Sequence, residues 1–310
     1  MPTSGETPED IATASCIMIP DVILAGDLLI YRTEQIDGRF VSFCVKNKVN
    51  KQISSVAQGK SVVHVRAEEL SKISVTFPAL DEQQKILSLL ESIDRRIATQ
   101  QKLIETLKKY KRGLNRRLLS QIEESYNCKL GSVCKIIGGG TPDTLHGEYW
   151  GNSVEWFTPS EIGKTKYVNS SVRKLSNEGL SNSSAKLLPA GTVLLTTRAT
   201  LGEMSIAEKE CSTNQGFQSL IPLTSRVSSE YLYYMQIIIK PWCEKYSSGN
   251  TFREISKSAL SECIIPVPEK PQQDKIVKLL STVDTLIASE EKEASLLVQL
   301  KSSLLQQLFI

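Results

Sequence analysis

The chain holds few side chains of the kinds that catalyse reactions, and those it has do not stand at catalytic spacings. It contains two histidines, His64 and His146, and neither forms an HExxH motif or another pair at metal-binding spacing. No GxSxG nucleophile elbow and no Asn-Pro-Pro-aromatic tetrad of an amino-methyltransferase occurs. The sequence therefore predicts a protein that binds its target without transforming it, with no catalytic residue, no metal and no cofactor.

Two glycine-containing segments could approach a phosphate group. Residues 163–165 (GKT) resemble the end of a phosphate-binding loop, but Thr158 stands where that motif requires its first glycine. The cradle of backbone amides therefore cannot form there. Residues 138–142 (GGGTP) follow an apolar run, so their backbone could come close to a phosphate or a base edge. A flexible loop explains this second segment equally well.

The composition is that of an ordinary soluble globular protein. The 310 residues are 40% hydrophobic and 23% charged, which argues against disorder and against membrane spanning. The N-terminus lacks the basic start of a secretory signal, so we expect a cytoplasmic protein with reduced cysteines. Six basic residues between positions 108 and 117 indicate either a solvated helix face or a phosphate contact.

A block of about fifty residues occurs twice, 190 positions apart and without a gap. A period this long excludes a short-period solenoid and indicates one unit used twice, most simply about a pseudo-twofold axis. Each copy predicts an exit strand, a proline and a long helix. The matching residues are Leu70, Ser71, Pro78, Gln83, Lys85, Ile86, Leu89, Leu90, Asp94 and Ile97, which recur as Leu260, Ser261, Pro268, Gln273, Lys275, Ile276, Leu279, Leu280, Asp284 and Ile287.

The helical parts of the repeat predict a long antiparallel two-helix coiled coil. Apolar residues recur at the 3.5-residue period of a coiled coil in both copies, and a helix of about 35 residues would be a spacer on the order of 50 Å long. Ordinary amphipathic helices packed on globular cores are the alternative. The predicted helix-pairing seam contains Ile93, Ile97, Leu107, Lys111, Leu114, Leu118, Val283, Ile287, Glu290, Leu297, Leu304 and Leu308.

Polar breaks in the seam suggest a register. If Gln100 faces Lys301, the equal spacing of the breaks in both helices makes Lys111 face Glu290. This pairing would join opposite charges and fix the register of the helices.

The rest of the chain predicts an α+β protein with two α/β domains. The first domain looks truncated. Residues 25–30 (AGDLLI) resemble residues 190–195 (AGTVLL) at an offset of 165, whereas Gly59 matches Gly249 at the offset of 190 found in the rest of the repeat. About 25 residues are therefore missing from the first copy between these two points. Nothing in its first 20 residues resembles the start of the second domain. The predicted parts are a truncated N-terminal domain at 1–79, a first coiled-coil helix at 80–125, a complete C-terminal domain at 126–268 and a second coiled-coil helix at 269–310.

This order of parts resembles the DNA-specificity subunit of type I restriction-modification systems over residues 22–310. The most specific matches are FPALDEQQKILSLLESIDRRI and VPEKPQQDKIVKLLSTVDTLI at the two helix starts, supported by GGGTP, WFTPSEI, TTRATLGE and SSGNTFREIS. The resemblance implies two target-recognition domains, separated by the coiled coil, that each read half of a bipartite site. It implies double-stranded DNA, adenine-N6 methyltransferase subunits and endonuclease subunits as partners.

Base-reading side chains are then expected in the loops of the second domain. Each candidate is equally well explained as a turn or capping residue. The candidates are Arg198 for guanine; Asn214, Gln215 and Asn250 for adenine; Thr141 and Thr251 for either base; Arg253 and Lys257 for phosphates; and Gly139 and Gly140 for close backbone approach.

The shortened first domain departs from the family pattern, since it has no counterpart of GGGTP or WFTPSEI. It is a minimal reader, or it is completed by self-association of the chain, or the chain is an inactive recombination remnant of a specificity gene. Two rival functions are a coiled-coil adaptor that never touches DNA and an enzyme with an unrecognised site.

Overall fold

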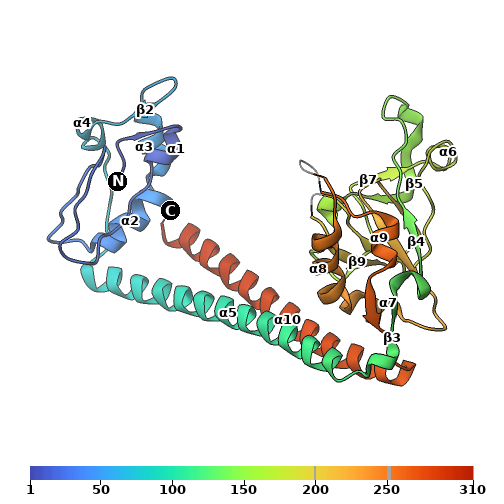
Figure 1. The fold of residues 1–310 in the computed structure, drawn as a ribbon. Helices are drawn as coiled ribbons and strands as arrows, with labels where there is room; N and C mark the ends of the chain where they lie inside the picture. The colour runs from blue at the N-terminus through green and yellow to red at the C-terminus, as the bar shows by residue number, and fades with distance from the viewer. Residues whose placement is uncertain (199, 250–252, 310) are drawn as a thin grey trace. The chain divides into compact units, whose positions relative to one another are not determined.

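The computed structural model describes residues 1–198, 200–249 and 253–309, and it divides into two compact units. One unit contains Met1–Thr106 and Ile287–Ile310, and the other contains Leu107–Leu286. Two long helices, α5 (Leu80–Ser120) and α10 (Lys270–Leu308), contribute to both units (Figure 1). Each unit therefore combines one domain with part of both helices.

The unit that contains Leu107–Leu286 is built on a five-stranded sheet. Its strands, in order across the sheet, are β4 (Cys134–Gly138), β11 (Gln218–Pro222), β8 (Val193–Leu195), β9 (Met204–Ala207) and β6 (Tyr167–Val168). β11 runs antiparallel to β4 and β8, while β6 is parallel to β9. Val193 and Leu195 join one buried cluster and Leu194 joins another, as the alternation of side chains along a strand requires.

Smaller elements surround this sheet. β5 (Trp150–Phe157) lies between β10 (Cys211–Thr213) and β7 (Arg173–Leu175), and β12 (Ile264–Pro266) pairs with β3 (Asn127–Lys129). The helices are α6 (Asn177–Ser181), α7 (Ser229–Tyr234), α8 (Gln236–Tyr246) and α9 (Lys257–Ser261). Four 3-10 turns are η1 (Glu124–Tyr126), η2 (Leu130–Ser132), η3 (Gly147–Tyr149) and η4 (Pro159–Glu161). Side chains of α7, α8 and α10 pack in the cluster of Val193, which confirms the predicted α+β class.

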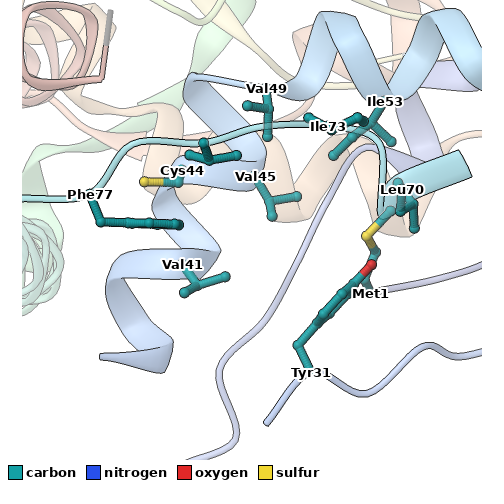
Figure 2. Close-up of a pocket in the computed structure, with 11 residues that line it drawn as sticks. Met1, Tyr31, Val41, Cys44, Val45, Val49, Ile53, Leu70, Ile73 and Phe77 are labelled. Atoms are coloured by element: carbon teal, nitrogen blue, oxygen red, sulfur yellow. The ribbon is translucent and has the colours of Figure 1, made fainter. Parts of the chain in front are cut away.

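The domain of the other unit is smaller, and its described residues form no counterpart of the five-stranded sheet. Its elements are β1 (Ser4–Gly5), α1 (Pro8–Ile11), α2 (Gly38–Asn47), α3 (Asn50–Val56), β2 (Val63–His64) and α4 (Ala67–Leu70). The apolar face of α2 lines a pocket with Met1, Tyr31 and Phe77 (Figure 2). The side chains of Ile19 and Ile23 are 70% and 94% exposed.

The predicted likeness of residues 25–30 to residues 190–195 holds only for the turn. Gly26 and Gly191 both have positive φ, +88° and +82°, but Leu28 forms a single isolated bridge with Pro2 where the second domain has strand β8. A strand is stable only beside others, and the neighbours of β8 have no counterpart in the described part of this domain.

A buried glutamine fastens each domain to the start of its long helix. Gln83 donates from Nε2 to the carbonyl of the exit proline five residues earlier (2.9 Å), and its Oε1 accepts from the Asp37 amide (3.0 Å). Gln273 makes the same bond to its own proline (2.8 Å) and accepts from the Ser228 amide (3.3 Å). Asp37 and Ser228 are the N-caps of α2 and α7. The repeat therefore includes these two helices as well.

In both units α5 and α10 run antiparallel and meet through the same ion pair. Asp94 Oδ1 lies 2.5 Å from Lys301 Nζ in one unit, and Lys111 pairs with Asp284 in the other. Asp284 is the repeat counterpart of Asp94, and Lys301 that of Lys111. The repeated sequence thus makes one contact twice.

The predicted register of the helices is wrong. Lys301 contacts Asp94 where Gln100 was expected, and Lys111 contacts Asp284 where Glu290 was expected. Gln100 instead bonds to Glu290. The prediction matched polar residues inside the seam, whereas the long lysine side chains reach carboxylates beside it. All twelve predicted seam residues, named above, are buried or half-buried.

Reversal of one charge in this ion pair tests the observed register. We expect Asp94→Lys to lower the free energy of unfolding by about 1 kcal/mol, because two lysines then face each other at a partly exposed site. The double variant with Lys301→Asp should recover most of the loss in a double-mutant cycle of thermal unfolding. Strictly additive effects would contradict the pairing.

The described residues contain no membrane-spanning helix, no cluster of metal ligands and no disulfide. None of their helices is long and apolar enough to cross a membrane, and no three or more of their His, Cys, Asp and Glu side chains gather as around a metal ion. All seven cysteines are free thiols, and five are buried. Burial raises the pKa of Cys134 and Cys211 to about 12, so these thiols stay protonated at neutral pH.

Candidate nucleic-acid interface

Three loops of the second domain meet at one end of the five-stranded sheet. They follow β4 at residues 139–142, follow β8 at 196–198 and 200–203, and precede β11 at 214–217. The Gly140 amide donates to the Thr213 carbonyl (2.8 Å), and the Thr197 amide donates to the Gly216 carbonyl (2.7 Å). The fold thus brings together segments that are far apart in the sequence.

Gly139 and Gly140 are packed against neighbouring backbone. A Cβ at Gly139 would overlap the Asn214 carbonyl oxygen, and one at Gly140 would overlap the backbone of Ser184. The indole nitrogen of Trp156 donates to the Gly140 carbonyl (3.0 Å). The structure therefore gives these glycines a packing role that holds the loops in place, which differs from both the flexible loop and the open backbone considered from sequence.

The polar side chains of these loops bond to one another. Thr141 donates from its hydroxyl to Gln215 Oε1. Asn214 Oδ1 accepts from the Gly216 amide (2.9 Å), which is the turn role that the sequence left open. Gln215 is exposed, and its amide nitrogen donates to no acceptor within the described ranges. It can therefore still donate to a base edge.

An ion pair links the loop after β8 to Glu254, which forms an isolated β-bridge with Ser248. Arg198 Nη2 lies 2.9 Å from Glu254 Oε2, and the two side chains are 44% and 36% exposed. The backbones of Ser248 and Glu254 exchange two hydrogen bonds, of 3.0 and 2.9 Å. Both charges of the pair thus lie at a surface formed by two candidate loops.

The remaining candidates are less clustered. Arg253 donates from Nη2 to the Glu244 carbonyl (2.5 Å), and exposed Lys257 is the first residue of α9. Asn250 and Thr251 lie outside the described residues.

Sequence reasoning missed a group of one cation and two aromatic rings. The guanidinium carbon of Arg173 lies 3.4 Å from the ring centre of Trp150 and 5.6 Å from that of Trp156. β5 and β7 pair antiparallel with Trp156 opposite Arg173 and Trp150 opposite Leu175, so each ring lies opposite Arg173 or the residue two positions along the same face of β7. Alternation along the two strands was the available signal, but their pairing is not visible in the sequence.

Tyr234 fixes the second domain on the helical parts of its own unit. Its hydroxyl donates to Asp284 Oδ2 (2.7 Å), the same carboxylate that pairs with Lys111, and its carbonyl accepts from Asn115 Nδ2 (2.9 Å). Lys166 Nζ donates to the Tyr234 hydroxyl (3.3 Å). Burial and the Asp284 carboxylate raise the pKa of Tyr234, so the phenol remains a donor at any physiological pH.

Comparison with known proteins identifies this arrangement. Residues 19–109 and 122–298 match the sequence model of the type I restriction modification DNA specificity domain. The chain belongs to this family. The resemblance seen in the sequence motifs is therefore confirmed over most of the chain.

Two relatives show how far the likeness extends within the specificity-domain family. The type I restriction enzyme MjaIX specificity subunit of Methanocaldococcus jannaschii is 36% identical over 186 residues, which are 59% of this chain and 43% of that protein. The EcoR124I/EcoR124II specificity subunit of Escherichia coli is 28% identical over 237 residues, 71% of this chain and 57% of that protein. The chain thus matches about half the length of these relatives.

Solved structures of the specificity-domain family share the fold. One structure comes from a study of complex assembly and conformational transition of the type I R-M system. The match covers 89% of this chain and 71% of that chain, with a TM-score of 0.62 and 22% sequence identity. The type I S subunit from M. genitalium covers 87% and 72%, with a TM-score of 0.55 and 19% identity. These matches support the mixed fold with two long helices.

Proposed function

We propose that the chain is a non-catalytic, cytoplasmic DNA-specificity subunit of a type I restriction-modification complex. It binds double-stranded DNA and directs adenine-N6 methyltransferase and endonuclease subunits to the site. The convergence of the loops at one end of the five-stranded sheet carries this proposal, because it offers several base-reading side chains on one surface. Self-association of two copies remains a further prediction.

Arg198 and Glu254 together suit a single G·C base pair. An arginine donates two hydrogen bonds to O6 and N7 of guanine, and a glutamate accepts from N4 of cytosine. The two side chains already lie 2.9 Å apart and both are partly exposed. In the bound complex Arg198 would donate to the guanine edge in place of the Glu254 carboxylate. The carboxylate would then accept a hydrogen bond from the cytosine amino group, so neither charged group is left without a partner.

Methylome sequencing tests this function in cells that carry the chain with its methyltransferase partner. The proposal predicts an adenine-methylated motif that disappears when the chain is deleted. Arg198→Ala and Glu254→Gln should relax or lose the motif at the same G·C position, with about 5- to 150-fold weaker discrimination there. Changes at two unrelated positions would contradict the shared base pair.

Arg226→Ala is a matched control, because Arg226 is an exposed arginine of the same domain without an ion pair among the described residues. The motif should survive this change. If Arg198→Ala also left methylation unchanged, the chain would act as an adaptor that does not contact DNA.

A further inference from the structure

Charge is distributed very differently in the two copies of the repeat. Residues 38–66 of the shortened domain contain six basic residues and no acidic one. The corresponding residues 229–256 of the complete domain contain three basic and three acidic residues. This segment of the first domain therefore carries an excess of positive charge, whereas the corresponding segment of the second domain is neutral.

Most of these basic side chains have no ion-pair partner among the described residues. Arg39 pairs with Asp37 (2.7 Å) and with Glu91 (2.6 Å). The other five basic residues form no ion pair with any part of the chain that the structure describes, and four of them are exposed. They are Lys46, Lys48, Lys51, Lys60 and Arg66, of which Lys48 is half-buried.

These five residues, called the basic surface below, lie on adjacent elements. Three lie at the end of α2 and the start of α3, and the other two lie in the loop and N-cap that precede α4. α3 contacts both α2 and α4. The five basic residues therefore lie on elements that neighbour α3.

The loop that carries Lys60 is flanked by a β-bridge at the repeat position of the Ser248–Glu254 bridge in the second domain. Gln58 and His64 exchange backbone hydrogen bonds of 2.9 and 2.8 Å, as Ser248 and Glu254 do. Gly59 has a positive φ of +143°. Its counterpart in the repeat has the same sign of φ, +109°. Both domains thus share this bridge and the positive-φ glycine beside it.

We propose that the basic surface binds the phosphate backbone of DNA and reads no bases. This rests on the proposed function. Lysine is a compact point charge suited to phosphates, and this domain lacks described counterparts of the loops that hold the other base-reading candidates. DNA is favoured over other polyanions because Glu254, in the equivalent bridge of the second domain, pairs with the base-reading candidate Arg198. The shortened domain therefore adds affinity, and the second domain alone supplies sequence.

The test is DNA binding by the complex assembled with its methyltransferase subunits, measured across salt concentrations on target and on unrelated duplexes. A variant with all five residues changed to glutamine should lower affinity for both duplexes by the same factor. The negative slope of log K against log salt should become shallower by roughly 0.9 for each phosphate contact that is lost. Loss of three to five contacts would change it by about 2.7 to 4.5. The methylated motif should stay the same.

Lys72→Gln with Lys85→Gln is the matched control, because both lysines belong to the same unit and are already paired with carboxylates. It should leave the slope unchanged, and thermal unfolding should show that both variants fold. An unchanged salt slope in the five-residue variant would overturn the proposal. So would a methylated motif with fewer specified bases, or a variant that binds DNA normally but no longer binds anionic vesicles. Failure of the proposed function would instead appear as a motif insensitive to Arg198→Ala.

Discussion

Gly139→Ala is expected to destabilise the second domain by about 3 kcal/mol or more, whereas Gly138→Ala one residue earlier is tolerated. A Cβ at Gly139 would overlap the Asn214 carbonyl oxygen, and backbone atoms cannot move aside as a flexible side chain can. A Cβ at Gly138 meets only the Gln218 side-chain amide, at 3.8 Å. In the Gly139→Ala variant the loops at the end of the sheet must separate, so we expect methylation of the target to decrease together with the free energy of unfolding.

Tryptophan fluorescence during urea unfolding measures this difference, because all three tryptophans belong to the second domain. Equal midpoints for the two alanine variants would show that the loops are not packed as described. A tolerated Gly139→Ala variant with normal methylation would restore the flexible-loop interpretation.

Gln273→Leu should have a comparable effect at the opposite end of the same domain. Gln273 is fully buried, its Nε2 donates to the carbonyls of Arg226 (2.7 Å) and Pro268 (2.8 Å), and its Oε1 accepts from the Ser228 amide. Leucine preserves the volume but leaves these backbone groups unpaired in the interior. We expect a loss of roughly 3 to 5 kcal/mol in the free energy of unfolding.

Gln272→Leu provides the comparison, because this half-buried neighbour on α10 forms no side-chain hydrogen bond with the described residues. It should shift the urea midpoint of the tryptophan signal little. Similar shifts of the urea midpoint for the two variants would mean that helix propensity or the loss of a polar side chain, and not the hydrogen bonds of Gln273, lowers the free energy of unfolding.

The sequence predicted the long helices well because their signal is local and repeated. A helix was expected at 80–125 and is found at Leu80–Ser120, and the second was expected at 269–310 and is found at Lys270–Leu308. The register could not be predicted in the same way. It depends on which carboxylate each lysine reaches across the helix pair and on how Phe309 packs against Phe40, with ring centres 5.1 Å apart.

The candidate site was predicted in its parts and not in its arrangement. Turn-forming residues such as Asn214 and Thr141 marked the loops correctly, but Arg198 pairs with Glu254, which lies 56 positions later in the chain and is held by a bridge to Ser248. The cation and ring group of Arg173 and Trp150 depends on strand pairing. Such contacts follow from tertiary structure, for which a single sequence carries no periodic signal.

The repeated ion pair makes each long helix complementary to itself. α5 carries both Asp94 and Lys111, which are the counterparts of Asp284 and Lys301 on α10. Two copies of α5 placed antiparallel could therefore satisfy both ion pairs with each other, so the chain has the contact pattern of a homodimer fused into one polypeptide. Exchanging the charges of Asp94 and Lys301 alone would remove that self-complementarity. A cell that expresses several related chains could use such an exchange to keep each helix with its own partner.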